Sequence, residues 1–230
     1  MQSVAKVWIM ILMMGALPGC FFFSTTFQTP DTLAPGKMAF QVGLVNAGSY
    51  DFARNKLGII NAGLLYGGVR AGLFKHMDGG IHANFLLVPV FFILVPAPTG
   101  LVGADLKYQF LQGDLRMAFN LRGSLYIRNI HDRWVVSYTP MVLIGRGVFY
   151  GGLGYTVLPF TPPPNEDFRL DLAPLFSDLT RGNIGRMMVG VVLPIAGDKS
   201  LMVETNVFVP SAGHQIIIGL GAGIRWKFAL

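Results

Sequence analysis

The sequence predicts an all-β protein, an antiparallel transmembrane β-barrel of about ten strands. Three observations lead to this fold class. Only 13% of the 230 residues are charged and 52% are hydrophobic, a balance typical of proteins that face lipid. Apolar and polar residues alternate with a period of two along much of the chain, as they do in strands. Short and long links follow one another between the alternating stretches, which favours a membrane barrel.

Helices are the other way to cross a bilayer, because every backbone polar group must be satisfied inside it. Beyond the N-terminus, residues 83–104 are the one segment that could form a spanning helix; they carry no charge, but Pro89, Pro96 and Pro98 interrupt them. Elsewhere charged residues recur too often for apolar spans of about 20 residues. The composition therefore favours strands.

The N-terminus has the pattern of an export signal. Lys6 precedes a short apolar core over residues 7–16, which is too short to span a bilayer unaided. We expect a signal peptide over residues 1–19, a lipid-anchored N-terminal linker over residues 20–35, and the transmembrane barrel over residues 36–230. The chain has one cysteine, which excludes an intrachain disulfide and a thiolate zinc cluster.

The end of this signal, Leu17-Pro18-Gly19-Cys20, resembles the lipobox of bacterial lipoprotein signal peptides. In that family the chain is cut before the cysteine, which then carries the lipid. The resemblance implies a covalent lipid on Cys20, and because Phe21 rather than Asp follows, it implies the outer membrane. A plain cleaved signal with a chance cysteine is the alternative.

Ten strands account for the alternation from residue 36 onward. "KMAFQVGLV" shows it in the first strand, "LVGADLKYQFL", "LRMAFNLRGSL" and "RWVVSYTP" in the fourth to sixth, and "LMVETNVF" and "QIIIGLGAGIRWKF" in the last two. The expected ranges are 36–46, 63–75, 79–88, 100–111, 114–127, 132–145, 147–158, 184–195, 199–209 and 214–228. Each is long enough for a tilted crossing. An even number of strands returns the C-terminus to the side where the barrel begins.

The links between these strands differ in length in a regular way. "HMD", "QGD", "GRG" and "AGDK" are tight, turn-like links after the second, fourth, sixth and eighth strands. The links after the first, third and seventh strands are long. This pattern, together with a last strand that ends near Phe228, resembles small bacterial outer-membrane β-barrels. The resemblance implies both termini on the periplasmic side, outer-membrane lipid as surroundings, and the barrel-assembly and lipoprotein-export machinery as partners.

A set of polar side chains is expected to point into the lumen: Arg70, His82, Asn84, Asp105, Lys107, Arg116, Asn120, Arg122, Arg133, Glu204 and Arg225. In a narrow barrel, such charges pair and fill the interior. The alternative is a selective channel or a small-ligand site. Because bases outnumber the acids Asp105 and Glu204, a solute or ligand in this lumen is expected to be anionic.

Catalysis, nucleic-acid binding and metal binding have little support in the sequence. Of the four histidines, only His82 is expected to point inward, and no His-x-Ser pair like that of lipid A deacylase barrels occurs. Lys and Arg are scattered singly, whereas nucleic-acid binding needs a clustered basic face. We therefore expect no catalytic residue, no nucleic acid, no metal, and no cofactor apart from the lipid on Cys20.

Three functions remain open. They are a structural or envelope-interaction barrel with a plugged lumen, a narrow channel or transport protein, and a lipid-directed enzyme with His and Ser close together at the lipid interface. Two segments stand apart from the pattern. Residues 159–183 form a loop rich in proline and acid, and the apolar residues 88–98 either extend the third and fourth strands or lie against lipid.

Overall fold

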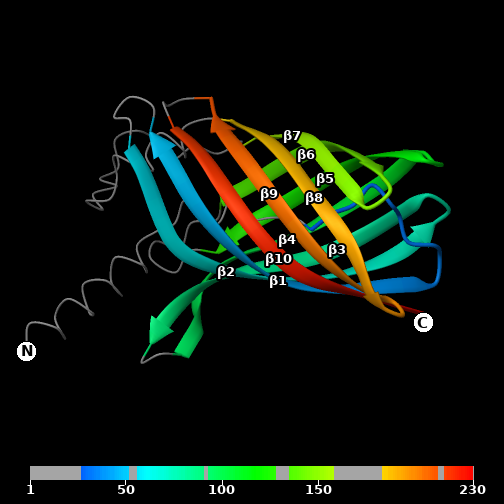
Figure 1. Cartoon of the computed structure of the whole chain (residues 1–230), viewed down its shortest axis with the longest axis horizontal. Helices are drawn as coiled ribbons and strands as arrows, with labels where there is room; N and C mark the ends of the chain where they lie inside the picture. Colours follow the sequence, from blue (N-terminus) through cyan, green and yellow to red (C-terminus); the bar gives the residue numbers. More distant parts are fainter. Residues whose placement is uncertain are drawn as a thin grey trace, which may run out of the picture.

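The computed structural model describes residues 27–51, 56–90, 93–127, 135–157, 183–211 and 215–229. In these ranges, ten antiparallel strands form one closed barrel, in which each strand pairs with its neighbour in sequence and β1 pairs with β10 (Figure 1). The predicted fold class, an antiparallel β-barrel of about ten strands, is confirmed. Across the described ranges, no helix is long and apolar enough to cross a membrane.

The strand bounds follow the predicted ranges closely, with longer second and fourth strands. They are β1 Lys37–Asp51, β2 Lys56–Phe74, β3 Met77–Val90, β4 Ile93–Leu111, β5 Leu115–Ile127, β6 Val135–Arg146, β7 Phe149–Thr156, β8 Ile184–Ala196, β9 Lys199–Pro210 and β10 Gln215–Ala229. Residue 56 rather than 63 begins β2, and residue 93 rather than 100 begins β4. The prediction of long links after the first and third strands is therefore wrong, because only residues 52–55 and 91–92 lie between these strands, whereas the link between β7 and β8 is long as predicted.

The four tight turns lie at one end of the barrel, which is also where β1 begins and β10 ends (Figure 1). We call it the short-turn end. The turns centre on backbone with positive φ, at His76 (68°), Gly113 (124°), Gly147 (57°) and Gly197 (54°). The predicted link "HMD" is wrong for Met77 and Asp78, because Met77 already begins β3. Asp78 is a buried strand residue whose carboxylate is bound inside the barrel.

The two faces of the wall differ as the alternation predicts. Along β4, Asp105, Lys107 and Gln109 are buried, and the residues between them, such as Leu106 and Tyr108, are exposed. Large apolar side chains are thus displayed outward while charged ones point into the lumen, which reverses the arrangement of soluble proteins. Such an outer face is what a bilayer requires of a barrel.

One hairpin reaches beyond the wall. Past the pair Gly63↔Leu87, β3 no longer pairs with β2, and before Gly100, β4 does not pair with β5. The two strands continue to pair with each other up to Val90↔Ile93, and this tip leaves the barrel in Figure 1. Of the two possibilities for the apolar residues 88–98, the extension of the third and fourth strands is confirmed.

Candidate functional site

The lumen holds part of the chain itself. Residues 27–34, which we call the inner segment, precede β1 and lie inside the barrel, with Phe27, Gln28, Thr29 and Pro30 buried. The Phe27 ring meets Tyr66 of β2 edge to face, with ring centroids 5.4 Å apart. Gly43, near the middle of β1, lies against the same ring. The inner segment therefore runs from the short-turn end to about half the depth of the barrel.

Glycines of the wall make room for the inner segment. A Cβ added at Gly43 would lie 2.5 Å from the Phe27 ring, which is closer than atoms pack. At Gly145 the corresponding distance to the Pro30 side chain is 2.7 Å, and at Gly72 the distance to the Ala34 carbonyl oxygen is 2.0 Å. Larger residues at these positions would have to displace the segment, so wall and segment are matched in shape.

Hydrogen bonds from the wall bind several polar groups of the inner segment. The Gln28 amide donates to Asp105 Oδ2 at 2.9 Å, and the Leu33 backbone N–H donates to Asp78 Oδ2 at 2.9 Å. Thr32 donates through both its N–H and its hydroxyl to Gln109 Oε1. These partners come from β3 and β4, and Gln41 of β1 donates to the Phe27 carbonyl oxygen at 2.9 Å.

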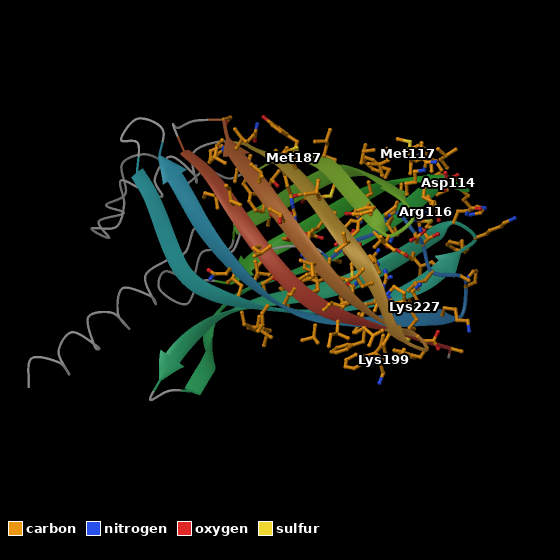
Figure 2. The ribbon with its side chains drawn as sticks, viewed as in Figure 1. Asp114, Arg116, Met117, Met187, Lys199 and Lys227 are labelled. Atoms are coloured by element: carbon orange, nitrogen blue, oxygen red, sulfur yellow. The ribbon has the colours of Figure 1, made fainter. Side chains whose placement is uncertain are left out.

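Three cations also bind the segment, Lys107 from β4, Arg116 from β5 and Arg225 from β10. Lys107 Nζ donates to the carbonyl oxygens of Thr29 at 3.0 Å and Asp31 at 2.5 Å. Arg225 Nη1 donates to the Thr29 hydroxyl at 3.1 Å. Arg116 Nη1 lies 2.9 and 2.8 Å from the two carboxylate oxygens of Asp31. Figure 2 shows Arg116 at the short-turn end of the barrel, where its side chain is only partly buried.

The wall residues around the segment form a network of ion pairs. Arg70 binds both Asp78 and Asp105, and the contact to Asp105 is 2.5 Å. Lys107 Nζ lies 3.4 Å from Asp78, and Asn120 donates to Asp105 at 3.1 Å. The network joins β2, β3, β4 and β5. Buried charges that are paired and hydrogen-bonded in this way avoid the cost of isolation.

His82 belongs to the same part of the lumen. Its Nε2 accepts a hydrogen bond from Arg122 Nε at 2.7 Å, and its ring stacks on Tyr66 with centroids 6.4 Å apart. Its Nδ1 lies 3.7 Å from Asp105. The imidazole is buried among these groups.

A second polar cluster lies on the opposite strands, β7 to β9. Glu204 accepts hydrogen bonds from Tyr150 at 3.0 Å and from Asn206 at 2.7 Å. Arg186 donates from Nε to Asn206 at 2.9 Å, and its guanidinium lies 5.1 Å from the centre of the Phe208 ring. All of these side chains are buried, so this part of the lumen is also filled.

The structure places most of the predicted lumen residues inside the barrel. Those buried there are Arg70, His82, Asn84, Asp105, Lys107, Asn120, Arg122, Glu204 and Arg225. Arg116 lies at the short-turn mouth instead of deep inside. Arg133, Cys20 and nearly all of the loop 159–183 lie outside the described residues. Among the described residues, no group of three or more His, Cys, Asp or Glu is placed to hold a metal ion.

Several residues of the site escaped the sequence reading. The sequence pattern predicts Asp78 in a turn, and Gln28 and Asp31 in the linker of residues 20–35. Arg186 has a usable signal, because Ile184, Arg186 and Met188 alternate with outward neighbours along β8. Tyr150 has a similar one in β7, where it follows the exposed Phe149. No local pattern could show that residues 27–34 lie in the lumen, because their partners are contributed by distant strands.

These features define a class: a closed ten-stranded barrel with an apolar exterior and a lumen filled by its own chain. The chain matches no protein-family model and no curated protein sequence. Its fold is similar to that of Neisserial surface protein A (NspA), at 12% identity over 84% of this chain and 99% of that chain, with a TM-score of 0.37. The outer membrane protease OmpT from Escherichia coli shows 10% identity over 87% and 100%, with a TM-score of 0.41. Ail from Yersinia pestis shows 8% identity over 84% and 99%, with a TM-score of 0.36.

Proposed function

We propose that the chain is a bacterial outer-membrane β-barrel with a structural or envelope-interaction role, whose lumen is closed by the inner segment. The observation that carries this proposal is the fit of residues 27–34 into the lumen. Gly43, Gly72 and Gly145 leave space for the segment, and buried side chains of the wall bind its polar groups. A conducting channel would need that space for solute.

The orientation and the anchor are part of the same proposal. With the short turns on the periplasmic side, β1 begins and β10 ends there, and the long links after β5 and β7 face outward. The lipobox resemblance supports a lipid on Cys20 and an anchored linker, with outer-membrane lipid, the barrel-assembly machinery and the lipoprotein-export machinery as partners. A periplasmic N-terminus stays a prediction, because residues 1–26 lie outside the described residues.

Conductance in a planar bilayer tests the closed lumen. The folded protein should show no steady conductance. A variant that loosens the inner segment, Phe27→Ala with Gln28→Ala and Asp31→Ala, removes its ring contact and two of its polar attachments. It should conduct, whereas the outward control Leu106→Ala should stay closed. Steady conductance of the unaltered protein would contradict the proposal.

A narrow channel for small anions is the second candidate, and one observation favours it. Cationic side chains buried in the described lumen outnumber buried carboxylates. Such a channel requires the inner segment to move out of the way. Anion-selective conductance that appears and disappears in the unaltered protein would favour this candidate, whereas conductance confined to the loosened variant would favour the plug.

A lipid-directed enzyme receives less support. Such an enzyme needs its histidine at the lipid interface, whereas His82 is held in the lumen by Arg122. His76 lies in the turn between β2 and β3, and His131 and His214 lie outside the described residues. A hydrolase assay on outer-membrane lipids, with His82→Ala as the variant, would test this candidate directly.

A further inference from the structure

A small cavity lies between the inner segment and the wall, near the short-turn end. Its volume is about 20 Å³. Four cationic side chains line it, namely Arg70, Lys107, Arg225 and Lys227, together with only two carboxylates, Asp31 and Asp78. Lys227 is exposed and marks the route to solvent, and Figure 2 shows it at the short-turn end.

The volume limits what the cavity can hold. A cavity needs about 10–15 Å³ to accommodate one water molecule. A cavity of 20 Å³ therefore has room for one or two waters or for one monatomic anion. Sulfate, phosphate and carboxylates such as gluconate are too large.

The charges buried in the lumen do not balance among the described residues. Five cationic side chains are at least nine-tenths buried, which are Arg70, Lys107, Arg122, Arg186 and Arg225, against the three carboxylates Asp78, Asp105 and Glu204. The half-buried pair of Asp31 and Arg116 is neutral. Five against three leaves two positive charges without a compensating carboxylate. Arginine cannot release its proton in a protein, and an uncompensated buried charge is costly.

Arg225 is a buried cation beside the cavity that forms no ion pair with a carboxylate among the described residues, although Asp31 and Asp78 attract it from farther away. It is 8% exposed, and its Nη1 donates to the neutral hydroxyl of Thr29. Its Nε has no hydrogen-bond partner among the described residues, and the same holds for Arg70 Nε on the cavity wall. Two buried N–H donors beside a cavity with excess positive charge favour the binding of a negatively charged acceptor.

We propose that this cavity binds one chloride-sized inorganic anion, with Arg225 as its main contact and with Arg70 and Lys107 contributing positive charge. Water is the competing occupant, because Gln28 Oε1, an acceptor that also lines the cavity, lacks a donor. Water would serve that atom, whereas an anion would not. The anion stabilises the closed lumen, because it neutralises Arg225 where the inner segment and β10 meet. This goes beyond the proposed plug, which does not itself require a bound ion.

Unfolding of the refolded full chain in detergent separates the two occupants. Urea midpoints are compared in sodium chloride, sodium bromide and sodium gluconate at equal ionic strength. Chloride and bromide should raise the midpoint and saturate, and gluconate should not, because a ligand that binds only the folded state stabilises it. Arg225→Met should lose this dependence. Arg122→Met, which removes a buried arginine away from the cavity, should retain it.

Bromide diffraction gives a second measurement that does not depend on how Arg225→Met folds. Crystals of the unaltered protein grown in bromide should show an anomalous peak between Arg225 and the inner segment. Equal midpoints in chloride and gluconate, or a cavity without an anomalous peak, would mean that it holds water only and would overturn the proposal. Halide dependence that survives in Arg225→Met would overturn it as well. A conducting lumen would contradict the proposed plug, but the halide dependence and the bromide peak would still test the anion site.

Discussion

Phe27 lies against Gly43, so close that a methyl group at position 43 would sit 2.5 Å from the phenylalanine ring. The ring belongs to the inner segment, and the glycine belongs to the middle of β1. This contact, repeated in kind by Pro30 and Gly145, makes the inner segment a part of the barrel's core. The stability of the barrel should therefore depend on it.

Gly43→Ala is expected to destabilise the barrel by about 1–3 kcal/mol, because overpacking forces side chains from their positions. Gly67→Ala is the matched control on the outward face, where a Cβ meets nothing within 4 Å. That control should leave the free energy of unfolding unchanged or slightly raised. Adding Phe27→Ala to Gly43→Ala should recover part of the loss. Equal effects of the two glycine substitutions in urea unfolding would show that the inner segment does not press on β1.

Glu204→Leu is expected to cost about 3–5 kcal/mol, because it leaves a buried cation without its partner. Tyr150 and Asn206 donate to this carboxylate, and Arg186 lies 3.8 Å away. Thr205→Leu changes the outward neighbour and should cost little. Urea unfolding of both variants measures the difference. If Thr205→Leu is the more damaging change, the inward and outward faces of β9 are assigned wrongly.

Asp105 and Asp31 bind arginines at different depths and should contribute differently to the free energy of unfolding. Asp105→Asn removes one of the two buried carboxylates that bind Arg70 and also the acceptor of Gln28 and Asn120, and should cost about 3–5 kcal/mol. Asp31→Asn weakens its pair with Arg116, whose side chains are 35% and 24% exposed, and should cost less than about 1 kcal/mol. The same unfolding measurement compares them. A larger loss for Asp31→Asn would place the main attachment of the inner segment at the mouth.

Cys20 is expected to carry the lipid, on the strength of Leu17-Pro18-Gly19-Cys20. Cells grown with an alkyne fatty acid should label the unaltered protein, and Cys20→Ala should lose the label. The chain has no other cysteine, so no second thiol can confuse the comparison. Equal labelling of both proteins would favour the plain cleaved signal.

The fold could be predicted from the sequence because the alternation of polar and apolar residues is a local pattern. In β4, the alternation of Asp105 and Lys107 with Leu106 and Tyr108 predicts a strand and also tells which side chains face inward. The extent of β2 and β4 was harder to predict, because residues 56–62 and 93–99 break the alternation. Their pairing is settled by the partner strand, as Val90↔Ile93 shows.

The candidate site could be predicted only in part, because the contacts of the inner segment are not local in the sequence. Gln28, Asp31 and Thr32 have the composition of an exposed linker, and nothing in their order indicates burial. Their partners Asp105, Arg116 and Gln109 are about 77–85 positions away in the chain. Gly43 and Gly145 are informative only after the barrel is closed and the space in front of them is known.

The position of the inner segment also constrains the order in which the barrel assembles. The segment is continuous with β1, and β1 closes the barrel by pairing with β10, the last strand to be synthesised. Thr29 meets Arg225 across 196 positions of the chain, so this contact between the inner segment and the wall cannot form until β10 is in place. If the seam zips while residues 27–34 are still outside, they have to thread through a closed mouth. Assembly avoids this threading if residues 27–34 already lie on the inner side of the sheet when β1 pairs with β10.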